Sequence, residues 1–299
     1  MVYTITFNPA IDYVIHTNEL QLGKMNRTQA EEIYFGGKGI NVSVALRELG
    51  IKSVALGFVA GFTGAAIEEG LKEKGIKTDF VHLAGGNSRI NIKIKCVQET
   101  EINAQGPDVY FGAIKDLLAK FDRIEDGDTI VISGSIPKAL PDDIYQQMLG
   151  RITGKRIKAV VDATGDLLLE TLQYRPFLIK PNREELEELF DVEIKTVDEI
   201  KQYAMKLHDM GAQNVIVSMD ADGAVLVDAD GNIHECAACK GTVKNSVGAG
   251  DAMVAGFLAG IEDNDYEYAL KLGTAAGGAT AFAEGMATKA EIDAMLATL

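Results

Sequence analysis

The chain has 299 residues, of which 47% are hydrophobic and 24% are charged, as is ordinary for a folded soluble protein of one or two domains. It carries 29 basic and 44 acidic residues, so its formal net charge is −15. This charge argues against nucleic acid or an anionic membrane as a partner, and no apolar run approaches membrane-spanning length. Three cysteines are too few for a disulfide framework, and no targeting segment precedes the first predicted strand, so we expect a cytoplasmic protein.

Short apolar segments alternate with amphipathic ones along most of the chain. The apolar segments predict strands over residues 3–8, 53–58, 129–133, 158–162, 177–180 and 214–218. The amphipathic segments predict helices over residues 41–49, 63–74, 110–121, 142–151, 182–190 and 197–210. This alternation indicates an α/β fold with a largely parallel sheet covered on both faces. We expect an antiparallel edge over residues 223–236 and helices from there to the end.

Two segments break the alternation. Residues 11–35 contain strand-like stretches with no helix between them, and residues 88–97 alternate strictly between apolar and polar side chains. Strict alternation is the pattern of a strand with one face in water. Its polar positions include Arg89, Asn91, Lys93 and Lys95. The two segments together predict a small accessory sheet, rich in basic side chains, inserted into the main domain.

The most informative motif is a bare loop, Gly248-Ala249-Gly250, followed by Asp251 and an apolar helix. Free N–H groups at such a helix start, together with the helix dipole, favour a multiply charged anion. A carboxylate beside that anion makes sense if it removes the proton of a hydroxyl that attacks the anion. The motif therefore predicts phosphoryl transfer, with the helix N-terminus favouring ionised Asp251 as a modest base. The alternative is a tight turn in which Asp251 only caps the helix.

A second glycine-rich motif, Gly-Gly-Lys-Gly-Ile-Asn over residues 36–41, opens the first predicted helix. It lacks the third glycine of a dinucleotide fingerprint and is not a P-loop. Lys38 offers a positive charge and Asn41 an amide beside a backbone that a ligand can approach closely. The alternative is a flexible connection between the accessory sheet and the core. Asp12, just beyond the first strand, could accept hydrogen bonds from sugar hydroxyls, or could simply serve a turn.

Residues after other predicted strands offer further polar groups. Asn182 and Glu185 share one helix face and could hold Mg²⁺ through water, form a capping box, or do both. Ser218 and Gly223 belong to a polar loop that could line a nucleotide pocket, and Ser135 presents a hydroxyl at another strand end. Each of these, taken singly, is also compatible with an ordinary turn.

In this order, the motifs resemble the ribokinase/PfkB family of sugar kinases over essentially the whole chain, in its sugar-phosphate branch. Within it they are most similar to 1-phosphofructokinases, with tagatose-6-phosphate kinases close behind. The resemblance implies a three-layer α/β/α ribokinase-like domain over residues 1–11, 36–87 and 106–299. A small β-sheet lid is then expected over residues 12–35 and 88–105, through which two copies could form a homodimer. One departure is mild: the family usually has Asp or Ser, then Thr, where this chain has Asn245 and Ser246.

The same resemblance assigns roles to individual residues. It implies that Asp251 is the base and that Gly248, Ala249 and Gly250 bind the transferring phosphoryl group. It places the hydroxyls of the ketohexose monophosphate on Asp12, Gly37 and Asn41. It places the phosphate on Lys24, Lys38 and Arg89, with Arg27 a weaker candidate. Gly36 and Ser135 are expected among the substrate-binding residues. ATP is expected on Lys180, Asn182, Ser218 and Gly223, with Mg²⁺ oriented by Glu185.

The expected reaction is the ATP-dependent phosphorylation of fructose 1-phosphate to fructose 1,6-bisphosphate. Tagatose 6-phosphate or fructose 6-phosphate, phosphorylated at the 1-position, is the alternative within the family. A non-catalytic sugar-phosphate sensor is disfavoured because a sensor has no need of Asp251.

Overall fold

The main sheet organises the molecule. The computed structural model describes the backbone of residues 1–299 and every side chain except that of residue 263. Within it, the strands of the main sheet follow the order β14-β13-β12-β11-β10-β9-β1-β4-β5, with β6 paired to β4. Their bounds are β1 Val2–Thr6, β4 Ser53–Ala60, β5 Lys77–Thr78, β6 Val81–Leu83, β9 Thr129–Ser133, β10 Lys158–Asp162, β11 Leu178–Ile179, β12 Val215–Ser218, β13 Ala224–Val227 and β14 Ile233–Cys236.

Most neighbouring strands of this sheet run parallel. The exceptions are the pairs β12–β13 and β13–β14, which form the antiparallel edge that the sequence predicts. In the middle of the sheet, Val2 of β1 lies opposite Ser53 of β4 on one side and Thr129 of β9 on the other. Because the central strands run parallel, their carboxyl ends meet at one edge, where ligands bind in open α/β sheets.

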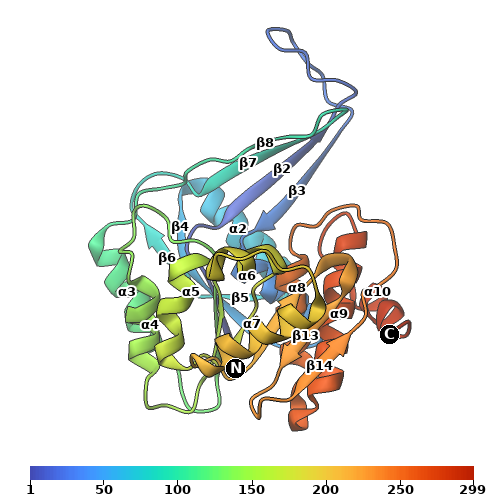
Figure 1. Cartoon of the computed structure of the whole chain (residues 1–299). Coiled ribbons are helices and arrows are strands. Elements are labelled where there is room, and N and C mark those ends of the chain that lie inside the picture. The colour runs from blue at the N-terminus through green and yellow to red at the C-terminus, as the bar shows by residue number, and fades with distance from the viewer.

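Helices cover both faces of the sheet (Figure 1). The helix α1 (Lys38–Glu48) and the long helices near the C-terminus share one apolar core with the sheet, and the middle third of the chain forms the other core. The first layer contains α2 Gly61–Glu73, α8 Ala249–Gly260 and α9 Tyr266–Phe282, with α10 Lys289–Leu296 packed on α9. The second contains α3 Phe111–Phe121, α4 Ile144–Ile152, α5 Gly165–Thr171, α6 Arg183–Phe190 and α7 Val197–Asp209.

These layers confirm the predicted three-layer α/β/α fold. The strands β5 and β6 and the helix α5 were not predicted, because segments of two, three and seven residues are too short to show a period. The helix α1 begins at Lys38, three residues before the predicted start, since Gly37 already serves as its N-cap. No described helix combines the length and the apolar character needed to cross a membrane.

A second, four-stranded sheet rises beside the main body in the order β3-β2-β7-β8 (Figure 1). Its strands are β2 Ala10–His16, β3 Ala30–Gly36, β7 Arg89–Lys95 and β8 Thr100–Ile102. Ile11 of β2 packs into a small core with α2, whereas Ile33, Ile90 and Ile102 are exposed. The segment between β2 and β3 extends farthest from the body of the molecule (Figure 1). We call this sheet the lid; its role in closure and its boundaries at residues 12–35 and 88–105 stay predictions.

Candidate active site

Two cavities open where the carboxyl ends of the strands meet the N-termini of α1 and α8. The larger has a volume of about 760 Å³ and the smaller of about 440 Å³. Lys38 lines both cavities, so they adjoin at its side chain. The predicted residues in the larger cavity are Lys180, Asn182, Glu185, Ser218, Gly223, Gly248, Ala249, Gly250 and Asp251. Those in the smaller cavity are Gly37, Arg89 and Ser135.

The glycines of the 36–41 motif bring α1 against β1. A Cβ on Gly39 would lie 2.4 Å from the backbone oxygen of Ile5, so only glycine fits there. Gly37 has a φ of +126°, which side-chain-bearing residues rarely adopt. The backbone N–H of Ile40 donates to Thr6 Oγ1 at 2.9 Å and fixes the approach. The motif therefore begins a tightly packed helix, not a flexible connection, and it places Lys38 between the two cavities.

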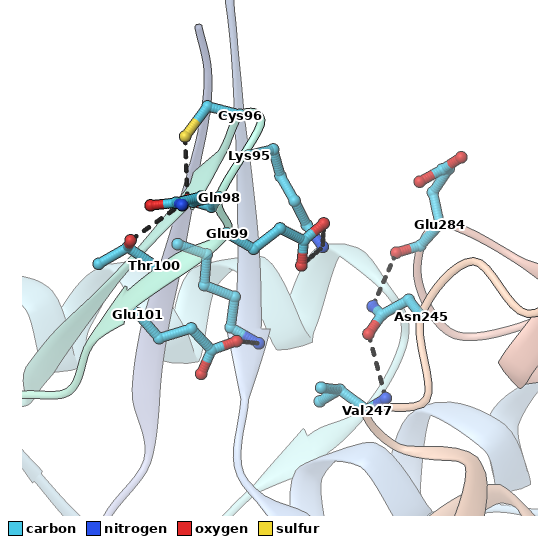
Figure 2. Close-up of polar contacts among 10 residues, drawn as sticks. Lys95, Cys96, Gln98, Glu99, Thr100, Glu101, Asn245, Val247 and Glu284 are labelled. Carbon is cyan, nitrogen blue, oxygen red and sulfur yellow. Dashed lines mark hydrogen bonds and ion pairs between the residues drawn. The ribbon is translucent and has the colours of Figure 1, made fainter. Parts of the chain in front are cut away.

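The loop before α8 is also held in place. Gly248 is the N-cap of α8 with a φ of +83°, and a Cβ on Gly250 would lie 2.9 Å from Lys180 Nζ. Upstream, Asn245 donates to the backbone oxygen of Glu284 at 3.0 Å and accepts from the N–H of Val247 at 3.1 Å (Figure 2). The N–H of Ala249 donates to the backbone oxygen of Ser246 at 3.2 Å. The bare helix start faces the larger cavity with Lys180 beside it, and its positive dipole end favours an anion there.

Asp251 is 5% exposed yet lines the larger cavity. Asn41 Nδ2 donates to its Oδ2 at 2.9 Å. Burial raises the pKa of Asp251 to about 6, and the charge of Asp162 adds to this, against the opposing effects of Asn41, Lys38 and Lys180. The expectation that the helix N-terminus makes Asp251 only a modest base is therefore wrong, because burial outweighs the helix dipole. A carboxylate with a pKa near 6 is a better general base at neutral pH.

Asp162 is a site residue that the sequence did not reveal. It ends β10, is 3% exposed, and lies between two lysines. Lys38 Nζ is 2.9 Å from its Oδ2, and Lys180 Nζ is 3.6 Å from its Oδ1. Burial alone would raise the pKa of Asp162, but Lys180 and Lys38 hold it below its usual value. Ligand-binding groups gather at the carboxyl ends of parallel strands, and this rule singled out Asp12 in the sequence. The same rule, applied to the strand that ends at Asp162, would have identified Asp162 as well.

The lid contributes a separate set of contacts. Asn91 Nδ2 donates to Asp12 Oδ1 at 2.8 Å, and a Cβ on Gly36 would lie 2.4 Å from Asp12 Oδ2. Gly36 is therefore a glycine because the Asp12 carboxylate lies against it. Arg89 Nε donates to the backbone oxygen of Asn8 at 3.0 Å, which aims the guanidinium along the smaller cavity. Asp12, Gly36 and Asn41 lie beside the cavities without lining either of them.

The other basic residues of the lid are not brought to a cavity. Lys95 pairs with Glu99 at 2.9 Å and Lys93 with Glu101 at 3.9 Å (Figure 2). Lys24 and Arg27 are exposed in the segment between β2 and β3 and line neither cavity. Within one chain, Arg89 is thus the lid cation that joins Lys38 at the smaller cavity.

Asn182 and Glu185 form a capping box at the start of α6. Asn182 Oδ1 accepts from the N–H of Glu185 at 2.7 Å, and Glu185 Oε2 accepts from the N–H of Asn182 at 2.8 Å. Both also line the larger cavity, so capping leaves Glu185 Oε1 for other partners. No group of three or more acidic, histidine or cysteine side chains among the described residues could hold a metal ion. One carboxylate fits Mg²⁺, which is held largely by phosphate oxygens and water.

Further lining residues had little signal in the sequence. Gly277, Gly278 and Phe282 of α9 line the larger cavity. In the sequence, small residues in an apolar helix indicate close helix packing and give no sign of a binding site. Residues 104–108 and Lys138 line the smaller cavity. Residues 101–107 form the stretch most similar to 1-phosphofructokinases, but the sequence assigned them no binding role.

Comparison with known proteins decides the family. The model of the pfkB family carbohydrate kinases matches residues 5–293. The chain belongs to the PfkB family. The 1-phosphofructokinase of Bacillus subtilis is 42% identical over 99% of this chain and 97% of its own length. The D-tagatose-1-phosphate kinase of Bacillus licheniformis is 38% identical over 98% of this chain and 96% of its own.

Solved structures give the same answer. Phosphofructokinase-2 from Escherichia coli, solved in complex with substrates and products, superposes with a TM-score of 0.93 at 26% identity, covering 100% of this chain and 99% of its own. The predicted family, fold and class of enzyme, a sugar-phosphate kinase, are confirmed. Kinases of this family use ATP as their cosubstrate.

Proposed function

We propose that this kinase transfers the γ-phosphoryl group of ATP to the 6-hydroxyl of fructose 1-phosphate and forms fructose 1,6-bisphosphate. The observation that carries the proposal is the placement of Lys38. It adjoins the glycine loop and Asp251 on one side and the cavity lined by Arg89 on the other. A substrate with a reacting hydroxyl at one end and a phosphate at the other fits this arrangement.

Each residue has a separate part in the reaction. Asp251 accepts the proton of the 6-hydroxyl, while the backbone of residues 248–250 at the start of α8 binds the transferring phosphoryl group. Lys38 and Arg89 bind the phosphate already on the sugar, with Gly37 and Ser135 in the same cavity. Asp12, Gly36 and Asn41, which lie beside the cavities, orient the sugar hydroxyls in this proposal.

The nucleotide binds on the larger cavity in this proposal, along Lys180, Asn182, Ser218 and Gly223. Glu185 holds Mg²⁺ through water, and the metal neutralises charge on the phosphates when bound. Closure of the lid over the sugar excludes water from the γ-phosphate, so we expect slow ATP hydrolysis when no sugar phosphate is present.

D-tagatose 1-phosphate is the second candidate acceptor. It differs from fructose 1-phosphate only in configuration at C4, and the relative from Bacillus licheniformis named for it is 38% identical. Two similar kinases, from Bacillus licheniformis and Klebsiella oxytoca, are named for D-tagatose 1-phosphate, which supports an acceptor with its phosphate at C1. Phosphofructokinase-2 from Escherichia coli, 26% identical, was solved with fructose 6-phosphate, so the 6-phosphates stay as alternatives.

A panel of four acceptors in a coupled assay of ADP release tests the proposal. We expect the largest kcat/KM with fructose 1-phosphate, then tagatose 1-phosphate, and much smaller values with the two 6-phosphates. A preference for either 6-phosphate would contradict the assignment. Binding of sugar phosphate without any ADP release would favour a sensor.

We further propose a homodimer that forms through the lid. Support comes from the apolar side chains that the lid and its projecting segment expose, Leu22, Met25, Ile33, Ile90 and Ile102. A tetrameric inhibited form of Escherichia coli phosphofructokinase-2 is among the similar structures, at 26% identity with a TM-score of 0.89. In such a dimer, Lys24 of one chain would contact the sugar phosphate bound to the other chain. Sedimentation of the wild type and of Ile33→Glu tests this; a monomeric wild type would refute it.

A further inference from the structure

A charged triad joins three separate parts of the chain: buried Asp162 and Lys180, and the partly exposed Lys38. Lys38 begins α1, Asp162 ends β10, and Lys180 follows β11. Each oxygen of Asp162 faces a different ammonium group, at 2.9 Å and 3.6 Å. All three residues line the larger cavity, and Lys38 lines the smaller one too.

Stability does not account for this arrangement. Burying charges costs free energy that their mutual attraction often fails to recover, so apolar residues of similar size would serve the fold as well. Lysine side chains are long and carry much rotamer freedom. A buried carboxylate that engages both of them restricts both at once. Lys180 Nζ is thereby held beside Gly250, and Lys38 Nζ between the cavities.

We infer that Asp162 is a positioning residue for phosphoryl transfer, holding Lys38 and Lys180 on either side of the path of the phosphoryl group before the substrates bind. This role rests on the proposed kinase reaction. It goes beyond that reaction by assigning the placement of both lysines to the carboxylate between them. The polar and charged groups facing Asp251 are Asn41, Asp162, Lys38 and Lys180, and Glu185 also faces Lys38.

Asp162→Asn tests the role, because it keeps the size of the side chain and removes its charge. The lysines lose their shared counter-ion, and misplacement by about 1 Å can cost about 10²-fold in rate, so we expect kcat to fall by about that factor. The KM values for ATP and fructose 1-phosphate should not rise, since removal of a negative charge favours anionic ligands. A partly unfolded population would also lower the apparent kcat with unchanged KM, so kcat is referred to the folded fraction measured by circular dichroism.

The pH profile gives a readout that a merely structural role would not move. The charge of Asp162 helps to raise the pKa of Asp251 to about 6. In Asp162→Asn this effect is gone and the two lysines remain, so the acid limb of kcat/KM should move below pH 6. Asp162→Glu, which restores the charge, should return the limb toward pH 6 and recover part of kcat.

Asp228→Asn is the matched control. Asp228 is 2% exposed, directly follows β13, and accepts hydrogen bonds from Asn232 and His234, away from both cavities. Its loss should lower the melting temperature while kcat and the acid limb stay unchanged. If Asp162→Asn behaves like Asp228→Asn, the positioning role is wrong.

Two further measurements keep the role and the proposed function apart. Recovery of the wild-type rate in Asp162→Asn by added Mg²⁺ alone would make Asp162 a metal ligand and overturn positioning.

Calorimetric titration with ADP and Mg²⁺ needs no turnover. We expect ADP to bind Asp162→Asn at least about threefold more tightly than wild type, from the lost negative charge. Should wild type turn over none of the acceptors, the proposed function fails, while an unchanged ADP affinity would overturn the role of Asp162.

Discussion

The nucleotide side of the site and the lid are built in different ways. On the nucleotide side, Asp162, Lys180 and Asp251 are each at most 7% exposed and contact one another or the helix starts around them. In the lid, Asp12 and Arg89 are only half-buried, and the projecting segment between β2 and β3 is exposed. The groups of the main sheet are therefore buried, whereas those of the lid are partly exposed to solvent.

The difference indicates a division of labour. Groups that must be placed accurately at the moment of transfer lie on rigid elements whose packing restricts them. Groups that recognise the sugar phosphate lie on a sheet that can close over it. Changes at Asp251 and Asp162 should therefore act mainly on kcat, and changes in the lid mainly on KM for the sugar phosphate. The predictions below test this separation.

Asp251→Asn should produce the largest effect. Loss of the general base should lower kcat by about 10²–10⁴-fold. The affinity for ADP should change little, because the glycine loop and Lys180 remain. Steady-state kinetics and calorimetry measure the two quantities. Asp116→Asn, on the exposed face of α3, is the control and should match wild type in both. A near wild-type kcat in Asp251→Asn would refute the assignment of the base.

The second-largest effect is expected when the pH of the wild-type assay is lowered. Asp251 must be ionised to accept a proton, and its pKa is raised to about 6. The value of kcat/KM should therefore fall about tenfold per pH unit below pH 6, whereas an ordinary aspartate would sustain it to about pH 4. A profile measured from pH 4.5 to 8, with stability checked at each pH, decides between them. A flat profile down to pH 5 would mean that Asp251 is not as buried in solution.

Sequence patterns found the main strands and the helices beside them, because apolar runs and helical periods are local signals. They found the glycine loops for the same reason, since a run of glycines before a helix requires a close backbone approach. They missed Asp162 because its partners, Lys38 and Lys180, come from other segments of the chain. They gave the wrong direction for the pKa of Asp251 because the depth of burial depends on the whole fold. Sequence patterns also could not distinguish the basic residues of the lid: Lys95 pairs with Glu99, whereas Arg89 lines the smaller cavity.

Arg89→Ala tests the lid side of the comparison. A hydrogen bond to a charged group is worth about 1.5–3 kcal/mol, so KM for fructose 1-phosphate should rise about 10- to 100-fold. The reacting hydroxyl lies at the other end of the sugar, so kcat should stay close to wild type. Lys95→Ala is the matched control, a cation on the same strand that pairs with Glu99, and its KM should be unchanged. A pure loss of kcat in Arg89→Ala would contradict the division between the two sides.

The smallest expected effect separates capping from nucleotide binding at Asn182. Asn182 caps α6 and also lines the larger cavity, whereas Thr196 caps α7 with the same kind of capping box away from both cavities. Replacing either residue by alanine should cost about 1 kcal/mol of unfolding free energy, since each leaves the same helix N–H without its acceptor. Only Asn182→Ala should also raise KM for ATP, because only that side chain meets the nucleotide. Denaturant unfolding and steady-state kinetics on both variants measure the two effects. An equal loss of stability with an unchanged KM for ATP would leave Asn182 as a cap alone, and the nucleotide would then depend on Lys180 and the glycine loop.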